Sequence, residues 1–186
     1  TAPAATTTNV LQGILASQPE AVQARYSARH PQETLTFFGI VPGMTVIEAL
    51  PGSGWYSKLL LPLLGEQGQL IGAGYDLEML PLFDFYDAAR LGELAQWKNE
   101  WPAEATAWDE TQGASVSAFY FGNLPQALHG TADAVLFIRA LHNMARFSET
   151  KDFLGSAIEN AFQALKPGGI VGIVQHAAPA DMPTTW

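Results

Sequence analysis

The chain has 186 residues, a length that suits one domain, and its 48% hydrophobic and 15% charged residues argue against a disordered chain or a coiled coil. Nine Lys and Arg against eighteen Asp and Glu give a net charge of −9, which argues against a nucleic-acid partner held through phosphates. There is no cysteine and no apolar run of membrane-span length, so disulfides, thiolate metal sites, thiol catalysis and a membrane span are not expected.

The first 40 residues come before the predicted sheet. Residues 1–16 begin with small, uncharged side chains and are predicted to form a flexible lead-in, left by removal of a secretion signal or by trimming. Residues 17–40 are predicted to be a helical segment. Ser17 and Glu20 have the spacing of a capping box, and Pro31 suits the first position of a second short helix.

Residues 41–186 alternate apolar strand patterns with helical patterns and show no internal repeat. The predicted strands cover residues 44–49, 69–74, 114–121, 134–138 and 170–174. The predicted helices cover residues 55–64, 83–101 (ended by Pro102), a short segment up to 129, and 148–165. This order predicts an α/β fold with a doubly wound, mostly parallel sheet and helices on both faces.

Ligands of such sheets bind beyond the carboxyl ends of the strands. Glu48 and the turn 51–54 follow the first strand, where glycines allow a ligand to approach the backbone and a helix start offers N–H groups. Asp76 lies about 20 positions beyond this turn, where an acid binds ribose hydroxyls in nucleotide sites, and Tyr75 is placed to pack on an adenine. The alternative is that Asp76 only caps the turn before Glu78.

A second group of polar residues follows the fourth strand. Arg139, His142 and Asn143 stand in one predicted loop, which suits the binding of a polar substrate. His142 is a candidate base or, alternatively, a hydrogen-bonded structural residue, and His176 after the fifth strand is a weaker candidate. The histidines are too far apart for a metal motif, so no metal ligands are predicted.

Four motifs together resemble a class I S-adenosylmethionine-dependent methyltransferase. They are residues 46–54, residues 68–72, residues 133–136 with 141–143, and residues 165–169. The resemblance covers roughly residues 40 to 176. Residues 38–56 also resemble a group of bacterial predicted methyltransferases, several of which carry secretion signals.

The resemblance implies S-adenosylmethionine as the cofactor and assigns roles to particular residues. It implies that the cofactor lies along Glu48, Gly52, Ser53, Gly54, Tyr75, Asp76 and Asn123. It implies that the substrate approaches Tyr56, Arg139, His142 and Asn143.

The chain departs from the family pattern at three positions. Leu50 stands where the first glycine of the turn is usual, and Gly74 stands where the ribose-binding acid is usual. The third strand ends in 120–122 without the acid that often holds the adenine amino group.

The resemblance implies methyl transfer from S-adenosylmethionine to a small-molecule acceptor, with His142 as a base where the acceptor must lose a proton. The net charge favours a neutral or cationic acceptor over a nucleic acid. The alternative is a non-catalytic protein that kept the fold and lost or altered its cofactor site. An oxidoreductase that uses a dinucleotide is disfavoured by the motif at 165–169.

Two expectations concern the ends of the chain. The family's sheet continues after the fifth strand with a helix and two more strands, whereas ten residues follow His176, so the domain 41–186 is expected to be incomplete at its C-terminus. An active S-adenosylmethionine enzyme is expected in the cytoplasm, and a chain that has lost a signal peptide is expected in the periplasm or outside the cell. The oligomeric state stays open.

Overall fold

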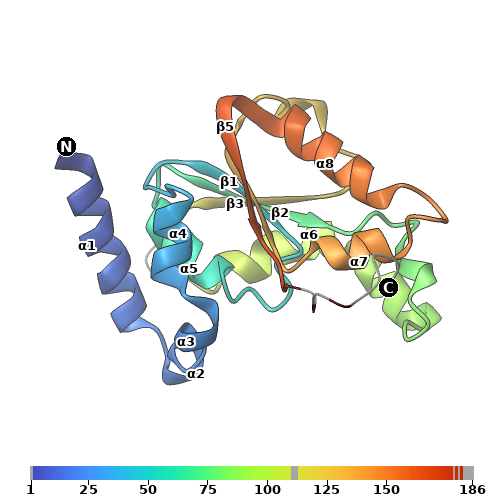
Figure 1. Cartoon of the computed structure of the whole chain (residues 1–186), viewed down its shortest axis with the longest axis horizontal. Coiled ribbons are helices and arrows are strands. Elements are labelled where there is room, and N and C mark those ends of the chain that lie inside the picture. The colour runs from blue at the N-terminus through green and yellow to red at the C-terminus, as the bar shows by residue number, and fades with distance from the viewer. Residues whose placement is uncertain (1, 110–112, 178, 180, 182–186) are drawn as a thin grey trace.

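The computed structural model describes residues 2–109, 113–177, 179 and 181, and Figure 1 shows a central sheet with helices on both sides. The sheet has five strands in the order β3-β2-β1-β4-β5, and every neighbouring pair is parallel. The strands are β1 Thr45–Ala49, β2 Gln69–Gly74, β3 Ser115–Tyr120, β4 Ala132–Ile138 and β5 Leu165–Val174. The predicted doubly wound α/β fold is therefore confirmed.

The helices alternate with the strands after an N-terminal helical part. The α-helices are α1 Ala2–Ser17, α2 Glu20–Gln23, α3 Tyr26–Arg29, α4 Pro31–Phe37, α5 Ser57–Leu64, α6 Ala88–Thr106, α7 Leu141–Arg146 and α8 Phe153–Ala164. Two 3₁₀ turns, η1 Leu80–Leu82 and η2 Gln126–Leu128, lie in the connections.

The two faces of the sheet bury different residues of the same strands. Val46 of β1 and Leu70 of β2 join a core with α1, α4, α5 and α6. Their neighbours Ile47 and Ile71 join a second core with α7 and α8. Successive side chains of a strand point to opposite faces, so apolar residues in consecutive positions are what a strand buried on both faces requires.

The N-terminal part differs from its prediction. Residues 2–17 form α1, where a flexible lead-in was predicted, because Leu11, Ile14 and Leu15 have helical spacing and pack against the core that contains α4 and α5. The single helix predicted to start at Ser17 is instead two short helices, α2 and α3. Residue Pro31 does begin α4, as expected.

Helices α6, α7 and α8 also differ from the predictions. Helix α6 begins at Ala88 after the cap Asp87 and continues through Pro102, because Trp101 and Ala105 on either side of the proline are buried on the sheet. Helix α8 begins at Phe153, after the cap Asp152, not at 148. The loop predicted after β4 contains helix α7.

Glycines in β2 allow a close approach by α6. A Cβ added at Gly72 would lie 2.7 Å from the Trp101 ring, and one at Gly74 would lie 2.8 Å from the Trp97 ring. The glycines therefore let two tryptophans of α6 pack directly on the strand.

Strand β5 is one edge of the sheet. Among the residues that the structure describes after Val174, none forms a further strand, and Val171 and Ile173 of β5 are 41% and 48% exposed. The opposite edge is β3. The carboxyl ends of all five strands meet at one side of the sheet, where the predicted site residues follow β1, β2 and β4.

Candidate functional site

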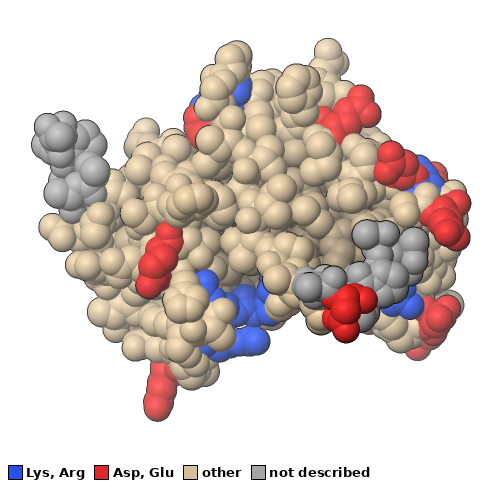
Figure 2. Space-filling model, in the orientation of Figure 1, with Lys and Arg blue, Asp and Glu red and all other residues tan. Residues whose placement is uncertain are grey.

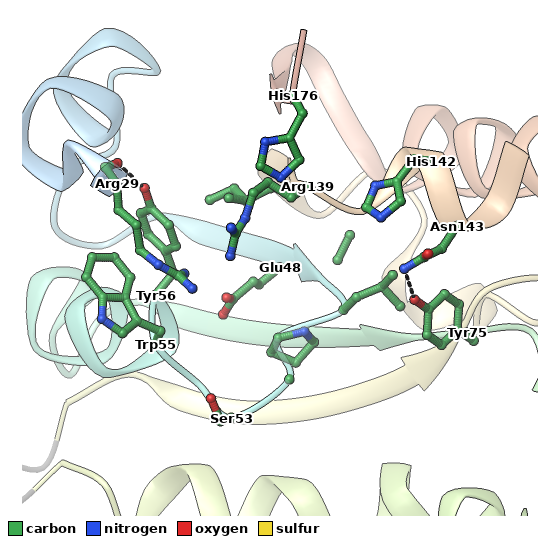
Figure 3. A pocket seen from close by; sticks show the side chains of 15 residues that line it. Arg29, Glu48, Ser53, Trp55, Tyr56, Tyr75, Arg139, His142, Asn143 and His176 are labelled. Atoms are coloured by element: carbon green, nitrogen blue, oxygen red, sulfur yellow. Dashed lines mark hydrogen bonds between the residues drawn. The ribbon is translucent and has the colours of Figure 1, made fainter. Parts of the chain in front are cut away.

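A cavity of about 430 Å³ opens at the carboxyl ends of β1 and β4, and we call it the first cavity (Figure 3). It is lined by Arg29, Glu48, Ala49, Leu50, Pro51, Gly52, Ser53, Trp55, Tyr56, Tyr75, Ile138, Arg139, His142, Asn143 and His176. Most of the residues predicted for cofactor and substrate therefore lie around one space. Arg29 and Trp55 were not predicted, and no motif marks Arg29, which comes from the N-terminal segment.

A second cavity, of about 300 Å³, lies between β2, the turn after β1 and helix α6. It is lined by Leu50, Pro51, Gly52, Gly74, Tyr75, Leu80, Tyr86, Arg90, Leu94, Trp97 and Tyr120. The two cavities share residues 50–52 and Tyr75, so together they form a continuous region around the turn that follows β1.

A third cavity, of about 230 Å³, adjoins the first on the side of the N-terminal helices. It is lined by Ala28, Arg29, Tyr56, Ile138, Arg139, Val174, Gln175 and His176. Arg29 and Arg139 therefore stand at the boundary between the first and third cavities.

The turn after β1 keeps a glycine-type backbone although one glycine is replaced. Leu50 has a φ of 54°, Gly52 of 58° and Gly54 of 74°. A leucine in the left-handed region costs about 1 to 2 kcal/mol, and such strain clusters at functional sites. The substitution at Leu50 therefore leaves the turn in the conformation that a glycine would give it, and adds a side chain that lines both cavities.

Glu48 is the one acidic residue among those that line the first cavity. The residue is only 4% exposed, and its Oε2 accepts a hydrogen bond of 2.6 Å from the hydroxyl of Ser57. Burial raises the pKa of Glu48 to about 7, against the opposing effects of the Ser57 hydrogen bond and the charge of Arg29. Burial therefore favours the protonated form of this carboxyl group.

Arg29 is fixed at the cavity by aromatic residues. Its guanidinium lies 4.5 Å from the ring centroid of Trp55, and its carbonyl accepts a 2.8 Å hydrogen bond from the Tyr56 hydroxyl. Its Nε is buried without a hydrogen-bond partner among the described residues. Burial lowers the pKa of Arg29, and the neighbouring charge of Arg139 lowers it further.

Tyr75, His142 and Asn143 form the opposite wall. The Asn143 amide donates a 2.6 Å hydrogen bond to the Tyr75 hydroxyl, and burial raises the pKa of Tyr75 to about 12. Tyr75 is therefore a neutral hydrogen-bonding group at physiological pH. The amide of Gln175 lies 3.1 Å from Nδ1 of His142, which leaves Nε2 as the ring nitrogen available to a ligand.

Three residues predicted for the cofactor do not line these cavities: Gly54, Asp76 and Asn123. The Asp76 carboxylate accepts 2.9 Å hydrogen bonds from Lys151 Nζ and from the backbone N–H of Glu78. This is the turn-capping arrangement that was the alternative for Asp76. Gly54 packs against Trp108, whose ring a Cβ at that position would overlap.

Gly74 stands where the resemblance to methyltransferases predicts an acid that binds the ribose. The Trp97 ring packs where a side chain at this position would project. No carboxylate lines the second cavity, and its walls are largely aromatic and aliphatic.

Within the described part of the chain, no group of three or more His, Asp or Glu side chains is suited to a metal ion. None of the helices described there is both long and apolar enough to cross a membrane.

No family model and no curated protein matches the chain, but solved structures do. One is a SAM-dependent methyltransferase from Aquifex aeolicus, with a TM-score of 0.57 and 18% identity over 94% of this chain and 78% of that one. Two others are an arsenic(III) S-adenosylmethionine methyltransferase from Chlamydomonas reinhardtii (TM-score 0.44, 18% identity, 87% of this chain) and the YcgJ protein from Bacillus subtilis (0.48, 18%, 81%). This chain spans 47% and 52% of the lengths of those two proteins. The fold of the chain is that of the class I S-adenosylmethionine-dependent methyltransferases.

Proposed function

We propose that this protein transfers a methyl group from S-adenosylmethionine to a small-molecule acceptor. The observation that carries the proposal is the pair of cavities that meet at residues 50–52 and Tyr75, at the carboxyl edge of the sheet. Ligands of open parallel sheets bind at this edge. The second cavity is largely apolar and the first is polar, which suits a ligand with a flat aromatic end and a charged end.

The residues present fit such a cofactor. Tyr86, Trp97 and Tyr120 give the second cavity aromatic surfaces for a purine ring. The left-handed turn at Leu50 and Gly52 brings backbone close to both cavities, and Glu48 offers a carboxylate for a cationic group. Bound S-adenosylmethionine supplies a methyl carbon whose bond to sulfur breaks as the acceptor's bond forms, with the electron pair staying on sulfur.

The protein's own residues orient the acceptor and take up its proton. Methyl transfer needs alignment of the two reactants, which the walls formed by Tyr56, Tyr75 and Asn143 supply. An acceptor that must lose a proton finds the Glu48 carboxylate in the first cavity. In the neutral ring of His142 the basic nitrogen is Nδ1, which accepts from the Gln175 amide, so His142 can take a proton only when that bond breaks. Glu48, with a pKa of about 7, is poised for this role near neutral pH.

A specific observation favours the alternative of a non-catalytic binding protein. The second cavity has no carboxylate for ribose hydroxyls, because Gly74 and the Trp97 ring occupy that position. In that case the protein binds a different ligand, or binds the nucleoside without catalysing transfer.

Isothermal titration calorimetry with S-adenosylmethionine and S-adenosylhomocysteine tests the proposal. Binding of both is expected, and absence of binding at millimolar concentration refutes it. Gly52→Val and Gly130→Val form a matched pair, because both glycines have left-handed φ values, 58° and 65°, and only Gly52 lines the cavities. We expect both variants to lose stability and only Gly52→Val to lose ligand affinity. Binding without turnover across a panel of acceptors supports the non-catalytic alternative.

A further inference from the structure

Two arginines from distant parts of the chain meet at the first cavity. Arg29 belongs to α3 of the N-terminal segment, and Arg139 directly follows β4 with a left-handed φ of 56°. In Figure 3 the guanidinium of Arg139 lies above Glu48 and that of Arg29 lies beside it. In Figure 2, basic side chains gather in a hollow of a face that is mostly uncharged.

Both arginines line a cavity, and neither forms an ion pair with a described carboxylate. Arg90, Lys151 and Lys166 each form an ion pair of 2.7 to 2.9 Å, while Arg29 and Arg139 form none with the described residues. Burial lowers the pKa of Arg29, and the nearby charges of Arg139 and Arg25 lower it further. The carboxyl group nearest to Arg29 is Glu48, which forms no ion pair with either arginine and whose charge burial disfavours. An anionic ligand in this space would meet two guanidinium groups.

The surroundings do not neutralise the pair. The third cavity, which both arginines line together with His176, has no acidic residue among its lining residues. The first cavity has one, Glu48, whose pKa is raised to about 7 because burial disfavours its charge. The local charge is therefore positive within a chain whose net charge is −9.

We propose that the methyl acceptor is an anionic small molecule whose carboxylate or phosphate group lies between Arg29 and Arg139, at the boundary of the first and third cavities. This inference rests on the proposed function. Guanidinium groups bind such anions through paired N–H donors, and the buried Nε of Arg29 is a donor without a partner among the described residues. This proposal differs from the expectation, drawn from the net charge, of a neutral or cationic acceptor.

Anion binding in the presence of the cofactor product tests the proposal. Inorganic phosphate and acetate are titrated by calorimetry into the full chain, with and without saturating S-adenosylhomocysteine, at constant ionic strength. The variants are Arg29→Gln and Arg139→Gln. Arg25→Gln is the control, because it removes the same charge from the N-terminal segment at a residue that lines none of the three cavities.

We expect phosphate or acetate to bind the complex with S-adenosylhomocysteine. The dissociation constant is expected to rise at least tenfold in Arg29→Gln and in Arg139→Gln, because hydrogen bonds to charged groups are lost. It is expected to change far less in Arg25→Gln, because Arg25 acts on Arg29 through its charge and lines none of the cavities. S-adenosylhomocysteine affinity should be unchanged in Arg25→Gln, and in Arg29→Gln and Arg139→Gln it should fall far less than the anion affinity does.

Three results overturn the proposal. The first is the absence of anion binding to the wild-type complex, and the second is equal binding by all variants. The third is competition between the anion and S-adenosylhomocysteine with loss of S-adenosylhomocysteine affinity in the arginine variants, which assigns the arginines to the cofactor's carboxylate. Anion binding that depends on Arg29 and Arg139, without any S-adenosylhomocysteine binding, refutes the proposed function and supports the anion subsite by itself.

Discussion

Replacing Glu48 by Gln is expected to remove a pH dependence of stability that the wild-type protein shows. Glu48 is buried, and the pKa of its carboxyl group is raised from 4.5 to about 7. In the unfolded chain the group ionises near 4.5, so between pH 4.5 and 7 the folded state binds more protons than the unfolded state. The free energy of unfolding therefore falls as the pH rises through this interval and levels off above it.

The size of the effect follows from the two pKa values. The difference between 4.5 and about 7 corresponds to about 3 kcal/mol of preference for the protonated group in the folded state. Between pH 5 and pH 8, the contribution of Glu48 lowers the free energy of unfolding by about 2 to 3 kcal/mol. A glutamine keeps the acceptor oxygen that the Ser57 hydroxyl uses, over a distance of 2.6 Å, and removes the titration.

Urea unfolding at pH 5 and pH 8 measures the effect. From pH 5 to pH 8, the free energy of unfolding should fall by about 2 to 3 kcal/mol more in the wild-type protein than in Glu48→Gln. The variant should be the more stable of the two at pH 8. Glu66→Gln, at an exposed position in the turn after α5, is the matched control and should follow the wild type. Equal pH dependence in wild type and Glu48→Gln would show that the carboxyl group is hydrated or paired, and would refute the reasoning.

Three further predictions concern single positions. Leu50→Gly should relieve about 1 kcal/mol of left-handed strain and open both cavities, so calorimetry should show tighter binding of S-adenosylhomocysteine; weaker binding would mean that the leucine contacts the ligand. Asp76→Asn should lower the free energy of unfolding by about 1 kcal/mol, because the ion pair with Lys151 is lost, and should leave S-adenosylhomocysteine affinity unchanged. A tenfold loss of that affinity would show that Asp76 belongs to the cofactor site. Pro102→Ala should raise the thermal midpoint, because α6 continues through the proline and gains a backbone donor; a lower midpoint would mean that the ring packs better than a methyl group.

The order of strands and helices was predictable because consecutive apolar residues and turn signals are local. The burial of Val46 and Ile47 in opposite cores was predictable, because two consecutive apolar residues in a strand indicate burial on both faces of the sheet. Helix ends were less predictable. The continuation of α6 through Pro102 depends on the burial of Trp101 and Ala105 against the sheet, which is a tertiary contact that a local pattern does not contain.

The candidate site was predictable where it follows strand ends, and unpredictable where it depends on side-chain partners. Glu48, Arg139 and Asn143 were expected at the carboxyl edge and line the first cavity. Asp76 had the right spacing for a ribose, but its carboxylate is bonded to Lys151, which lies far away in the chain.

The sequence by itself determined that this is a doubly wound α/β chain with a glycine turn after its first strand, because strand patterns and turn residues act over a few positions. Only the tertiary structure brought Arg29 next to Arg139, since α3 and the end of β4 are about 110 residues apart and meet through the packing of the N-terminal helices. The net charge of −9 is a sum over the whole surface. The charge inside a cavity depends on which few side chains the fold turns toward it, and here those side chains are mostly basic.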